Sequence, residues 1–213
     1  PVDPSDTPLE YDLRPRTETV KVLNKITKKT FYAYFDNSNN EHVEVEEMAA
    51  TPNSAYGDSA NLRRTKTHYS KTEDEDLAGR LKTEEHPDGR LDTYSYERLA
   101  DHTFITTVTH GVIESPDGVA YKTTREVTTL DPEGNETVKE TYVYTGTDYE
   151  LVETMEKDFN ERGQITERRR NGRVLYSAVY ENGLRVSKTD EQGITINYTY
   201  DAHERVETET KVG

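Results

Sequence analysis

The sequence predicts an all-β protein of successive antiparallel β-hairpins, which form an elongated or curled meander sheet. Three observations predict it. Apolar and polar residues alternate over many short segments, Gly or Asn-Gly steps separate these segments at even intervals, and Thr and Tyr are abundant. The chain has 30 Thr and 15 Tyr in 213 residues, and both residue types favour a pleated, half-buried surface. We therefore expect a repeat-like sheet, partly of a single layer.

The composition argues against a globule with a thick apolar core. Leu, Ile, Val and Phe together make up 39 of 213 residues, and 27 basic against 42 acidic residues give a formal charge of −15. Such a composition is typical of disordered chains. A polar chain can nevertheless be ordered where its main-chain groups are hydrogen-bonded in a regular sheet. The same numbers therefore favour sheet over helix bundles or compact mixed folds.

The N-terminal third is the least regular part. Four prolines and no hydrophobic period predict an extended lead or linker over residues 1–19. Alternation predicts strands near residues 20–22 and 30–35 with a turn at Lys28-Lys29, and residues 49–61 read as an irregular connector. The expected division is a lead over 1–19, an N-terminal β portion over 20–70 and a hairpin array over 71–213.

Strand and turn signals alternate regularly in the array. In residues 194–200 every even position is apolar or aromatic and every odd position is polar, which is the period of a strand with one covered face. Glycines follow at intervals of about ten residues, which is enough for one strand and a tight turn. The strongest hairpin signals are Asn171-Gly172, Asn182-Gly183, Asp88-Gly89 and Asp117-Gly118, because these residue pairs tolerate the positive φ of primed turns.

The segment from Gly193 to Val206 resembles a YD repeat of the RHS family. That unit reads approximately Gly, several residues, Tyr-x-Tyr-Asp, two residues, Gly-Arg and an aliphatic residue, and Glu204 stands where the family usually has Gly. Weaker matches extend the resemblance over about residues 79–210, and it is best after residue 158. The residues assigned to the repeat motif, with a structural role, are Gly163, Gly172, Gly183, Gly193, Tyr198, Tyr200, Asp201 and Arg205.

The resemblance implies a structural, display or binding module of an exported bacterial polypeptide, secreted or at the cell surface. The chain is too short to close the full shell of that family. The self-cleaving core motif is also absent, since Asn135-Glu136 follows Asp131-Pro132-Glu133-Gly134. Self-cleavage is therefore not expected. The unit Tyr180-Glu181-Asn182-Gly183 is also similar to antitoxin-like and MORN-like hairpin repeats.

Several function classes are excluded by composition and motif. There is no Cys, which excludes disulfides, thiolate catalysis and Cys-ligated zinc. No apolar run approaches the length of a membrane span, and a charge of −15 disfavours nucleic-acid binding. The serine-nucleophile and phosphate-loop motifs are missing, so we expect no enzyme and no cofactor. The 42 acidic residues always include close pairs, but a thin sheet offers little cleft for carboxylate catalysis.

Candidate metal sites are weak. His102 and His110 share a face of an expected strand but are eight residues apart, too far for one ion. Calcium loops would need oxygen ligands at alternating positions, as at Asp36, Ser38, Asn40 and Glu41, and at Asp131, Glu133, Asn135 and Glu136. Both stretches lack the glycine and distal Glu of a complete loop, so polar turns are the simpler interpretation and no metal is expected.

Tyrosines form the most informative surface. Tyr142, Tyr144, Tyr176 and Tyr180 could stack across strands and stabilise the array, or could form an aromatic binding surface for a protein or carbohydrate partner. Three functions stay open: a non-enzymatic display or binding module, an acidic immunity or antitoxin-like protein that binds a basic partner, and a carbohydrate-binding or carbohydrate-processing β domain. Pairing through edge strands into oligomers is a further open alternative.

Overall fold

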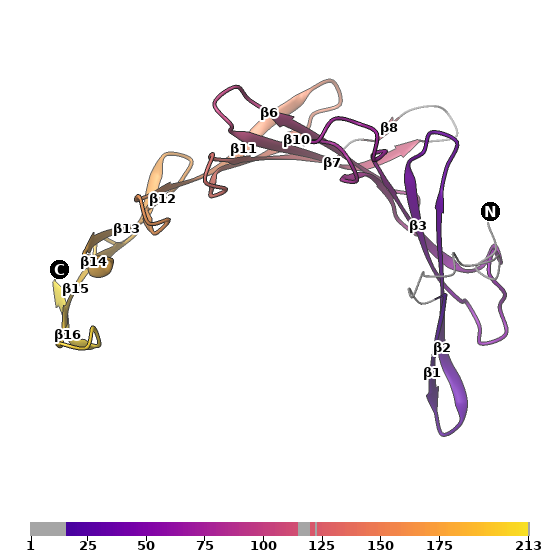
Figure 1. Cartoon of the computed structure of the whole chain (residues 1–213), viewed down its shortest axis with the longest axis horizontal. Helices are drawn as coiled ribbons and strands as arrows, with labels where there is room; N and C mark the ends of the chain where they lie inside the picture. Colours follow the sequence, from indigo (N-terminus) through magenta and orange to yellow (C-terminus); the bar gives the residue numbers. More distant parts are fainter. Residues whose placement is uncertain (1–15, 115–119, 122, 213) are drawn as a thin grey trace. The chain divides into compact units, whose positions relative to one another are not determined.

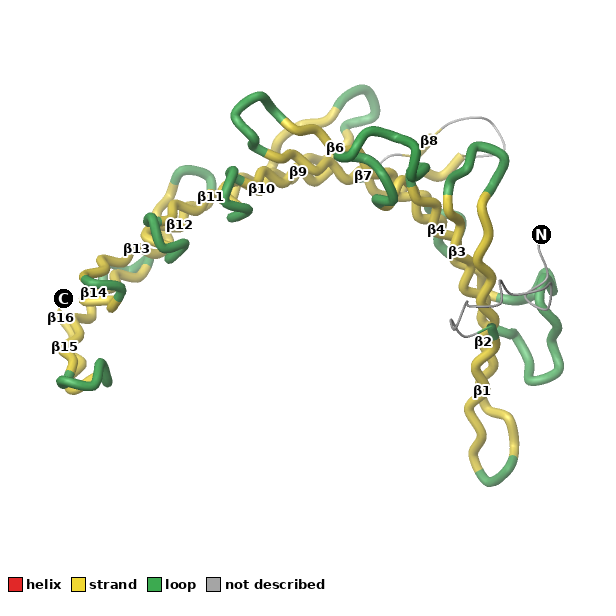
Figure 2. The backbone as a smooth tube through the Cα atoms, in the orientation of Figure 1, coloured by secondary structure: helices red, strands yellow, loops and turns green. Residues whose placement is uncertain are grey.

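The computed structural model describes residues 16–114, 120–121 and 123–212. These residues form strands, turns and loops with no helix (Figure 2), and the strands are antiparallel in one open sheet, so the predicted fold class is confirmed. Residues 1–15 of the expected lead lie outside the described residues, while Thr17 to Thr19 belong to the first strand. The turn signal at Pro116-Asp117-Gly118 also lies outside the described residues.

The chain divides into two compact units. Unit 1 comprises Pro1–Tyr96 and Val108–Thr123, and unit 2 comprises Glu97–Thr107 and Thr124–Gly213. Strands β1 to β5 lie in unit 1: Thr17–Val22, Lys25–Asp36, His42–Met48, Leu62–His68 and Leu81–Glu85. The next three are β6 (Leu91–Arg98), β7 (Phe104–Glu114) and β8 (Ala120–Tyr121).

Strands β9 to β16 lie in unit 2: Thr124–Leu130, Glu136–Tyr144, Tyr149–Phe159, Ile165–Arg170, Arg173–Glu181, Leu184–Asp190, Thr195–Tyr200 and Val206–Val212. They pair in chain order (Figure 1), each antiparallel to its neighbours. β8 alone lies off the main order and pairs with β7. Consecutive strands from β9 to β16 therefore pair as hairpins, as the sequence predicts.

Two kinds of turn close the hairpins. Seven hairpins share one pattern over a five-residue segment, whose three middle residues form the loop. The N–H of the first residue donates to the carbonyl of the fifth, and the N–H of the fourth residue donates to the carbonyl of the first. The fourth residue has positive φ, as in a type I turn with a G1 bulge. These loops run over residues 37–41, 86–90, 99–103, 131–135, 160–164, 190–194 and 201–205.

Three other tight turns have two-residue loops in which both residues have positive φ. Asn171-Gly172 and Asn182-Gly183 are of this kind, so their prediction as primed turns is confirmed. Asp88-Gly89 is not, because only Gly89 has positive φ. The turn expected at Lys28-Lys29 is also wrong: β2 runs through both lysines, and the chain reverses at Leu23-Asn24. The pair Leu23-Asn24 lacks the glycine that marks the other two loops. In a fourth two-residue loop, Gly146-Thr147, only Gly146 has positive φ, and the Thr145 N–H donates to the Asp148 carbonyl at 2.9 Å.

The one apolar cluster of the described residues lies in unit 1. Ala33, Val43 and Val45 are buried there, and Phe35 and Tyr56 pack against them. Tyr56 belongs to the connector 49–61, which folds back over this face of β2 and β3. Hydrogen bonds to the buried carboxylate of Glu47 fix the connector in place.

Glu47 is only 1% exposed. Its Oε1 accepts hydrogen bonds from the Gly57 N–H and from Asn61 Nδ2, both at 2.6 Å. Lys29 Nζ also donates to the Ser54 carbonyl at 3.2 Å. The connector therefore covers one face of the unit 1 sheet, while Tyr32, Tyr34, Glu44 and Glu46 alternate onto the other face.

Unit 2 has no comparable cluster among its described residues. Its buried apolar side chains are Phe104, Ala178 and Tyr198. Along β13 and β15 burial alternates: Ala178 and Tyr198 are buried, whereas their neighbours Val179, Asn197 and Thr199 are exposed. Ala178 and Tyr198 therefore lie on the same, better covered face of this sheet. No helix of the described residues is long and apolar enough to cross a membrane.

Candidate functional site

The four tyrosines of the expected aromatic surface lie on two opposite faces of unit 2. Tyr142 shares its face with Glu140, which lies opposite Thr154 of β11. Lys157, three residues further along β11 and so on the other face, is in register through β12 with Tyr176. Tyr142 and Tyr176 therefore point to opposite sides, and a ligand on one side cannot contact both.

The first face carries a small tyrosine cluster. The Arg125 guanidinium carbon lies 4.5 Å from the ring centroids of both Tyr142 and Tyr149, and the rings of Tyr144 and Tyr149 are 5.3 Å apart. Tyr142 donates its hydroxyl to Glu140 Oε2 at 3.0 Å. Burial, together with the nearby Glu140 carboxylate, raises the pKa of the Tyr142 hydroxyl. The rings of Tyr142 and Tyr149 therefore pack on one cation.

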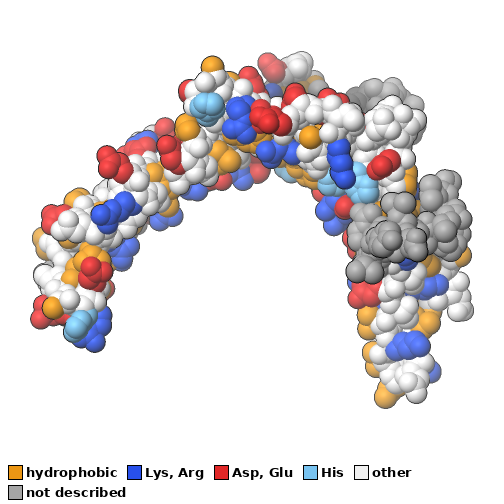
Figure 3. Space-filling model, viewed as in Figure 1, with side chains coloured by type: hydrophobic (Ala, Val, Ile, Leu, Met, Phe, Trp, Pro, Cys, Tyr) orange, Lys and Arg blue, Asp and Glu red, His pale blue; other side chains and the backbone are white. Residues whose placement is uncertain are grey.

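The opposite face, which we call the Tyr176 face, alternates tyrosine strands with basic strands. It is formed by Tyr176 and Tyr180 of β13, Tyr198 and Tyr200 of β15, Arg168 of β12, and Arg185 and Lys188 of β14. Figure 3 shows basic and acidic side chains interspersed over unit 2, with no large area of one sign. The basic side chains of β14 therefore separate the tyrosine pair of β13 from the tyrosine pair of β15.

Cations cover the rings of the Tyr176 face. Arg168 lies 4.9 Å from the Tyr176 ring centroid, and Arg185 and Lys188 lie 5.0 and 5.8 Å from that of Tyr198. Tyr198 is only 6% exposed. Such contacts stabilise by about 0.5–2 kcal/mol each and leave little ring surface for a ligand. The geometry therefore gives Tyr176 and Tyr198 a packing role, in which Arg and Lys side chains replace a second layer.

The remaining motif residues shape turns. Gly163 and Gly193 occupy the positive-φ position of three-residue loops, and Gly172 and Gly183 end two-residue loops. Tyr200 donates its hydroxyl to the Arg185 carbonyl at 2.8 Å, which ties β15 to β14. Each of these residues acts locally, on one turn or one strand pair.

Asp201 organises the last turn. Its Oδ1 accepts from the N–H groups of His203 and Arg205 at 2.8 and 3.0 Å, and its Oδ2 accepts from Arg205 Nε at 2.8 Å. Hydrogen bonds from the Arg205 side chain and backbone lower the pKa of the Asp201 carboxyl. Glu204 takes the left-handed position, with φ of 60°. The Asp–Arg pair of the YD-like segment is therefore a turn clamp.

A buried carboxylate with two histidines is a feature that the sequence did not indicate. Asp92 Oδ2 lies 3.1 Å from His86 Nε2 and 3.0 Å from His110 Nδ1, and its Oδ1 accepts the Gly111 N–H at 3.1 Å. Burial alone would raise the pKa of Asp92, but the hydrogen bonds from His110, His86 and Gly111 outweigh it and lower the pKa. The cluster fastens β6 to β7 within unit 1.

The expectation that His102 and His110 share a face of one strand is wrong. His102 lies in the turn before β7, with φ of 68°, and not in a strand with His110. His42 and His68 instead face each other across β3 and β4, with ring centroids 6.0 Å apart. Spacing along the chain could not predict either contact, because strand pairing joins residues that are far apart in the sequence. Asp92 and His110 are 18 positions apart, and His42 and His68 are 26 positions apart.

The two stretches weighed for calcium are hairpin turns. Asp131 accepts the Asn135 N–H at 2.7 Å and the Asn135 Nδ2 group at 2.9 Å. Glu41 accepts from Asn37 Nδ2 at 2.8 Å and from Lys82 Nζ at 2.5 Å, and hydrogen bonds from Asn37 and Lys82 lower its pKa. Within residues 16–114, 120–121 and 123–212, no group of three or more His, Asp or Glu is placed to hold a metal ion.

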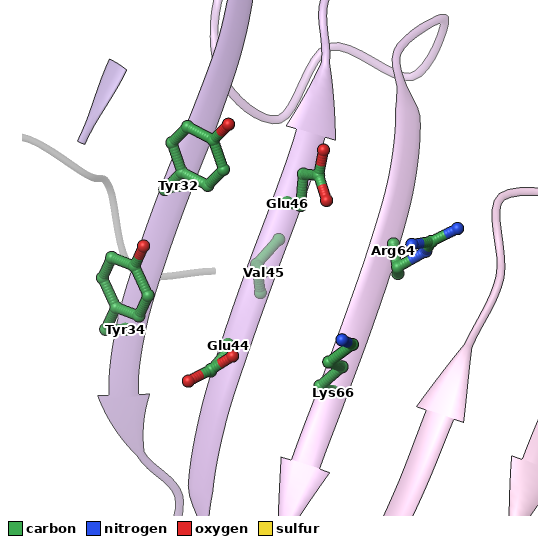
Figure 4. Close-up of a pocket in the computed structure, with 7 residues that line it drawn as sticks. All are labelled: Tyr32, Tyr34, Glu44, Val45, Glu46, Arg64 and Lys66. Carbon is green, nitrogen blue, oxygen red and sulfur yellow. The ribbon is translucent and has the colours of Figure 1, made fainter. Parts of the chain in front are cut away.

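A depression of about 150 Å³ lies on the face of unit 1 that the connector leaves uncovered (Figure 4). Its lining residues come from three neighbouring strands: Tyr32 and Tyr34 of β2, Glu44, Val45 and Glu46 of β3, and Arg64 and Lys66 of β4. The strands therefore present an aromatic row, an acidic row and a basic row side by side. Sequence reasoning missed this site, because each row belongs to a different strand.

Comparison with known proteins adds no relative. No protein-family model matches the chain, and no curated protein matches its sequence. The resemblance to RHS and YD repeats therefore stays a prediction made from the residues alone.

Proposed function

We propose that this protein is a non-enzymatic structural, display or binding module built like the RHS and YD repeats of exported bacterial polypeptides, secreted or at the cell surface. The single observation that carries the proposal is the neighbour-only pairing of unit 2, in which β9 to β16 pair strictly in chain order. The described residues of unit 2 bury few apolar side chains. Each hairpin is then stabilised mainly by the hairpins beside it, as in repeat arrays.

Shortening the array tests this proposal. A chain that ends at Asp190, and so lacks β15 and β16, should keep the hydrogen-exchange protection of β9 to β13, because these strands make no pairing contact with the removed residues. The full-length chain is the control. Loss of protection throughout β9 to β13 would show a single cooperative globule and would contradict the proposal.

A second candidate, an acidic immunity or antitoxin-like protein, is favoured by the formal charge of −15. Electrostatic attraction to a basic partner falls steeply with salt. Polylysine should then be captured at low ionic strength and released at high ionic strength. Equal capture of polyglutamate would exclude charge as the basis.

The carbohydrate alternative depends on accessible tyrosine rings. On the Tyr176 face, cations already lie over the rings of Tyr176 and Tyr198. Carbohydrate binding there is therefore less favoured than the abundance of tyrosine in the sequence suggests. Binding of neutral glycans that persists at high salt, and that is lost in Tyr180→Ser with the strands intact, would favour it over the other two.

A further inference from the structure

Charged rows cross the uncovered face of unit 1 in a fixed order. Glu46 lies directly opposite Arg64, and Glu44 lies directly opposite Lys66. Opposite charges at such positions usually pair, because their Cβ atoms are about 5 Å apart. Two of these four side chains form no such pair.

Glu46 and Lys66 are the two unpaired members. Arg64 turns away from Glu46 and places its Nε 3.4 Å from Glu84 Oε1 on β5, and Figure 4 shows its guanidinium pointing away from β3. In the described chain neither Glu46 nor Lys66 has an oppositely charged partner within 4.0 Å. The depression therefore keeps one free acid and one free base on adjacent strands.

Glu44 is held differently from Glu46. Its carboxylate oxygens lie 3.8 Å from His42 Nε2 and 3.9 Å from His68 Nε2. Glu44 also faces Tyr34 of β2 and Lys66 of β4, its direct cross-strand neighbours. Lys66 lies directly opposite Glu44 of β3 and Glu84 of β5, but its ammonium group is within 4.0 Å of neither carboxylate.

Tyrosines form the wall beside the acidic row. Tyr32 and Tyr34 stand on β2 next to Glu46 and Glu44 (Figure 4). The Tyr32 hydroxyl donates to Glu18 Oε2 at 3.1 Å, which fixes the ring at the edge of the depression. An ammonium group at Glu46 would thus meet a carboxylate and an aromatic ring together, the usual surroundings of a bound cation.

We propose that this depression binds a small zwitterion of the ω-amino acid type, with its ammonium group at Glu46 and its carboxylate at Lys66. Glu46 and Lys66 are diagonal neighbours across β3 and β4, about 7–8 Å apart at the backbone, so the two charges of the ligand must be separated by several bonds. The volume of about 150 Å³ is below the range of about 300–1,000 Å³ of drug-sized sites and suits a ligand of few atoms. The site lies in unit 1, so it does not depend on the function proposed for the array.

The test uses the full chain and 6-aminohexanoate as the probe, followed by calorimetry and by backbone amide shifts. We expect 6-aminohexanoate to shift amides of β2, β3 and β4, and to bind at least about tenfold more tightly than 1-aminohexane, hexanoate or glycine, because each of these satisfies one charge or spans too little. Equal binding of either single-charge analogue would overturn the proposal. So would the absence of both heat and amide shifts.

Two variants localise the binding. Glu46→Gln and Lys66→Gln should each weaken 6-aminohexanoate binding about tenfold or more, because each leaves one ligand charge unpaired. Glu207→Gln and Lys211→Gln, which remove the same charges from exposed β16 positions, are the matched controls and should bind as the unchanged chain does. Unchanged affinity in Glu46→Gln and Lys66→Gln would overturn the assignment. The amide shifts of the unchanged chain provide a test that needs no variant to fold.

Discussion

Replacing Tyr198 by Ala tests whether flat-lying tyrosines take the place of a core in unit 2. Tyr198 is 6% exposed and lies under Arg185 and Lys188. Losing about 150 Å² of buried surface at about 25 cal/mol per Å² costs up to about 4 kcal/mol. Because the Arg185 and Lys188 side chains can settle onto the smaller residue, we expect about 2–3 kcal/mol.

Amide hydrogen exchange measures this loss of stability strand by strand. The opening free energy of β14, β15 and β16 should drop by that amount, while the amides of β2 and β3 in unit 1 should be unchanged, because β14, β15 and β16 pair only with one another and with β13. Tyr198→Phe is the matched control. The Tyr198 hydroxyl makes no hydrogen bond within the described chain, so this variant should lose less than about 0.5 kcal/mol. A loss below about 1 kcal/mol in Tyr198→Ala, or equal losses in both variants, would refute the reasoning.

Three further predictions concern single contacts. Tyr200→Phe should cost about 1 kcal/mol in urea unfolding, because the hydroxyl donates to the Arg185 carbonyl; no loss would show that this bond contributes nothing. Glu204→Gly should stabilise the fold by about 1 kcal/mol and so raise the thermal midpoint, because residue 204 has a φ of 60°, which glycine adopts without strain. Glu191→Gly, at a loop position without positive φ, should not raise the midpoint. Asp92→Asn should cost about 2 kcal/mol at neutral pH. Because the pKa of Asp92 is lowered in the folded chain, its contribution is present above the unfolded pKa of about 3.9 and lost as pH falls through the folded pKa. The variant should therefore lose part of the acid dependence, and an unchanged pH profile would contradict this.

Hairpin closure is the part of the fold that could be predicted locally. Asn171-Gly172 and Asn182-Gly183 could be predicted because positive φ at both positions favours these residue types. The error at Leu23-Asn24 has the same basis. Neither residue is a glycine, so the turn had no strong signal, and the two lysines within β2 resembled one. His102 and Glu204 likewise hold left-handed positions that nothing in their residue type announces.

The candidate sites were harder to predict, because they depend on register. The depression needs Glu46, Arg64 and Lys66 in register across two strand pairs, and the Asp92 cluster needs β6 beside β7. Tyr142 and Tyr176 lie on opposite faces because the β11 residues aligned with Glu140, which shares the face of Tyr142, and with Tyr176 are three positions apart, Thr154 and Lys157. A shift of one residue in any strand would reverse these placements.

Turn chemistry and alternation of side chains act over a few residues, so the amino-acid order is enough to predict a chain that reverses direction about every ten residues and pairs with itself as antiparallel hairpins. Which side chains share a face becomes clear only in the folded sheet, since bulges and loop lengths set the register of each strand pair. The folded chain also places the connector 49–61 over one face of unit 1 and leaves the tyrosine, acidic and basic rows of the other face uncovered. Burial of Glu47 with its partners from that connector is the physical reason, and it depends on residues that lie ten and fourteen positions apart.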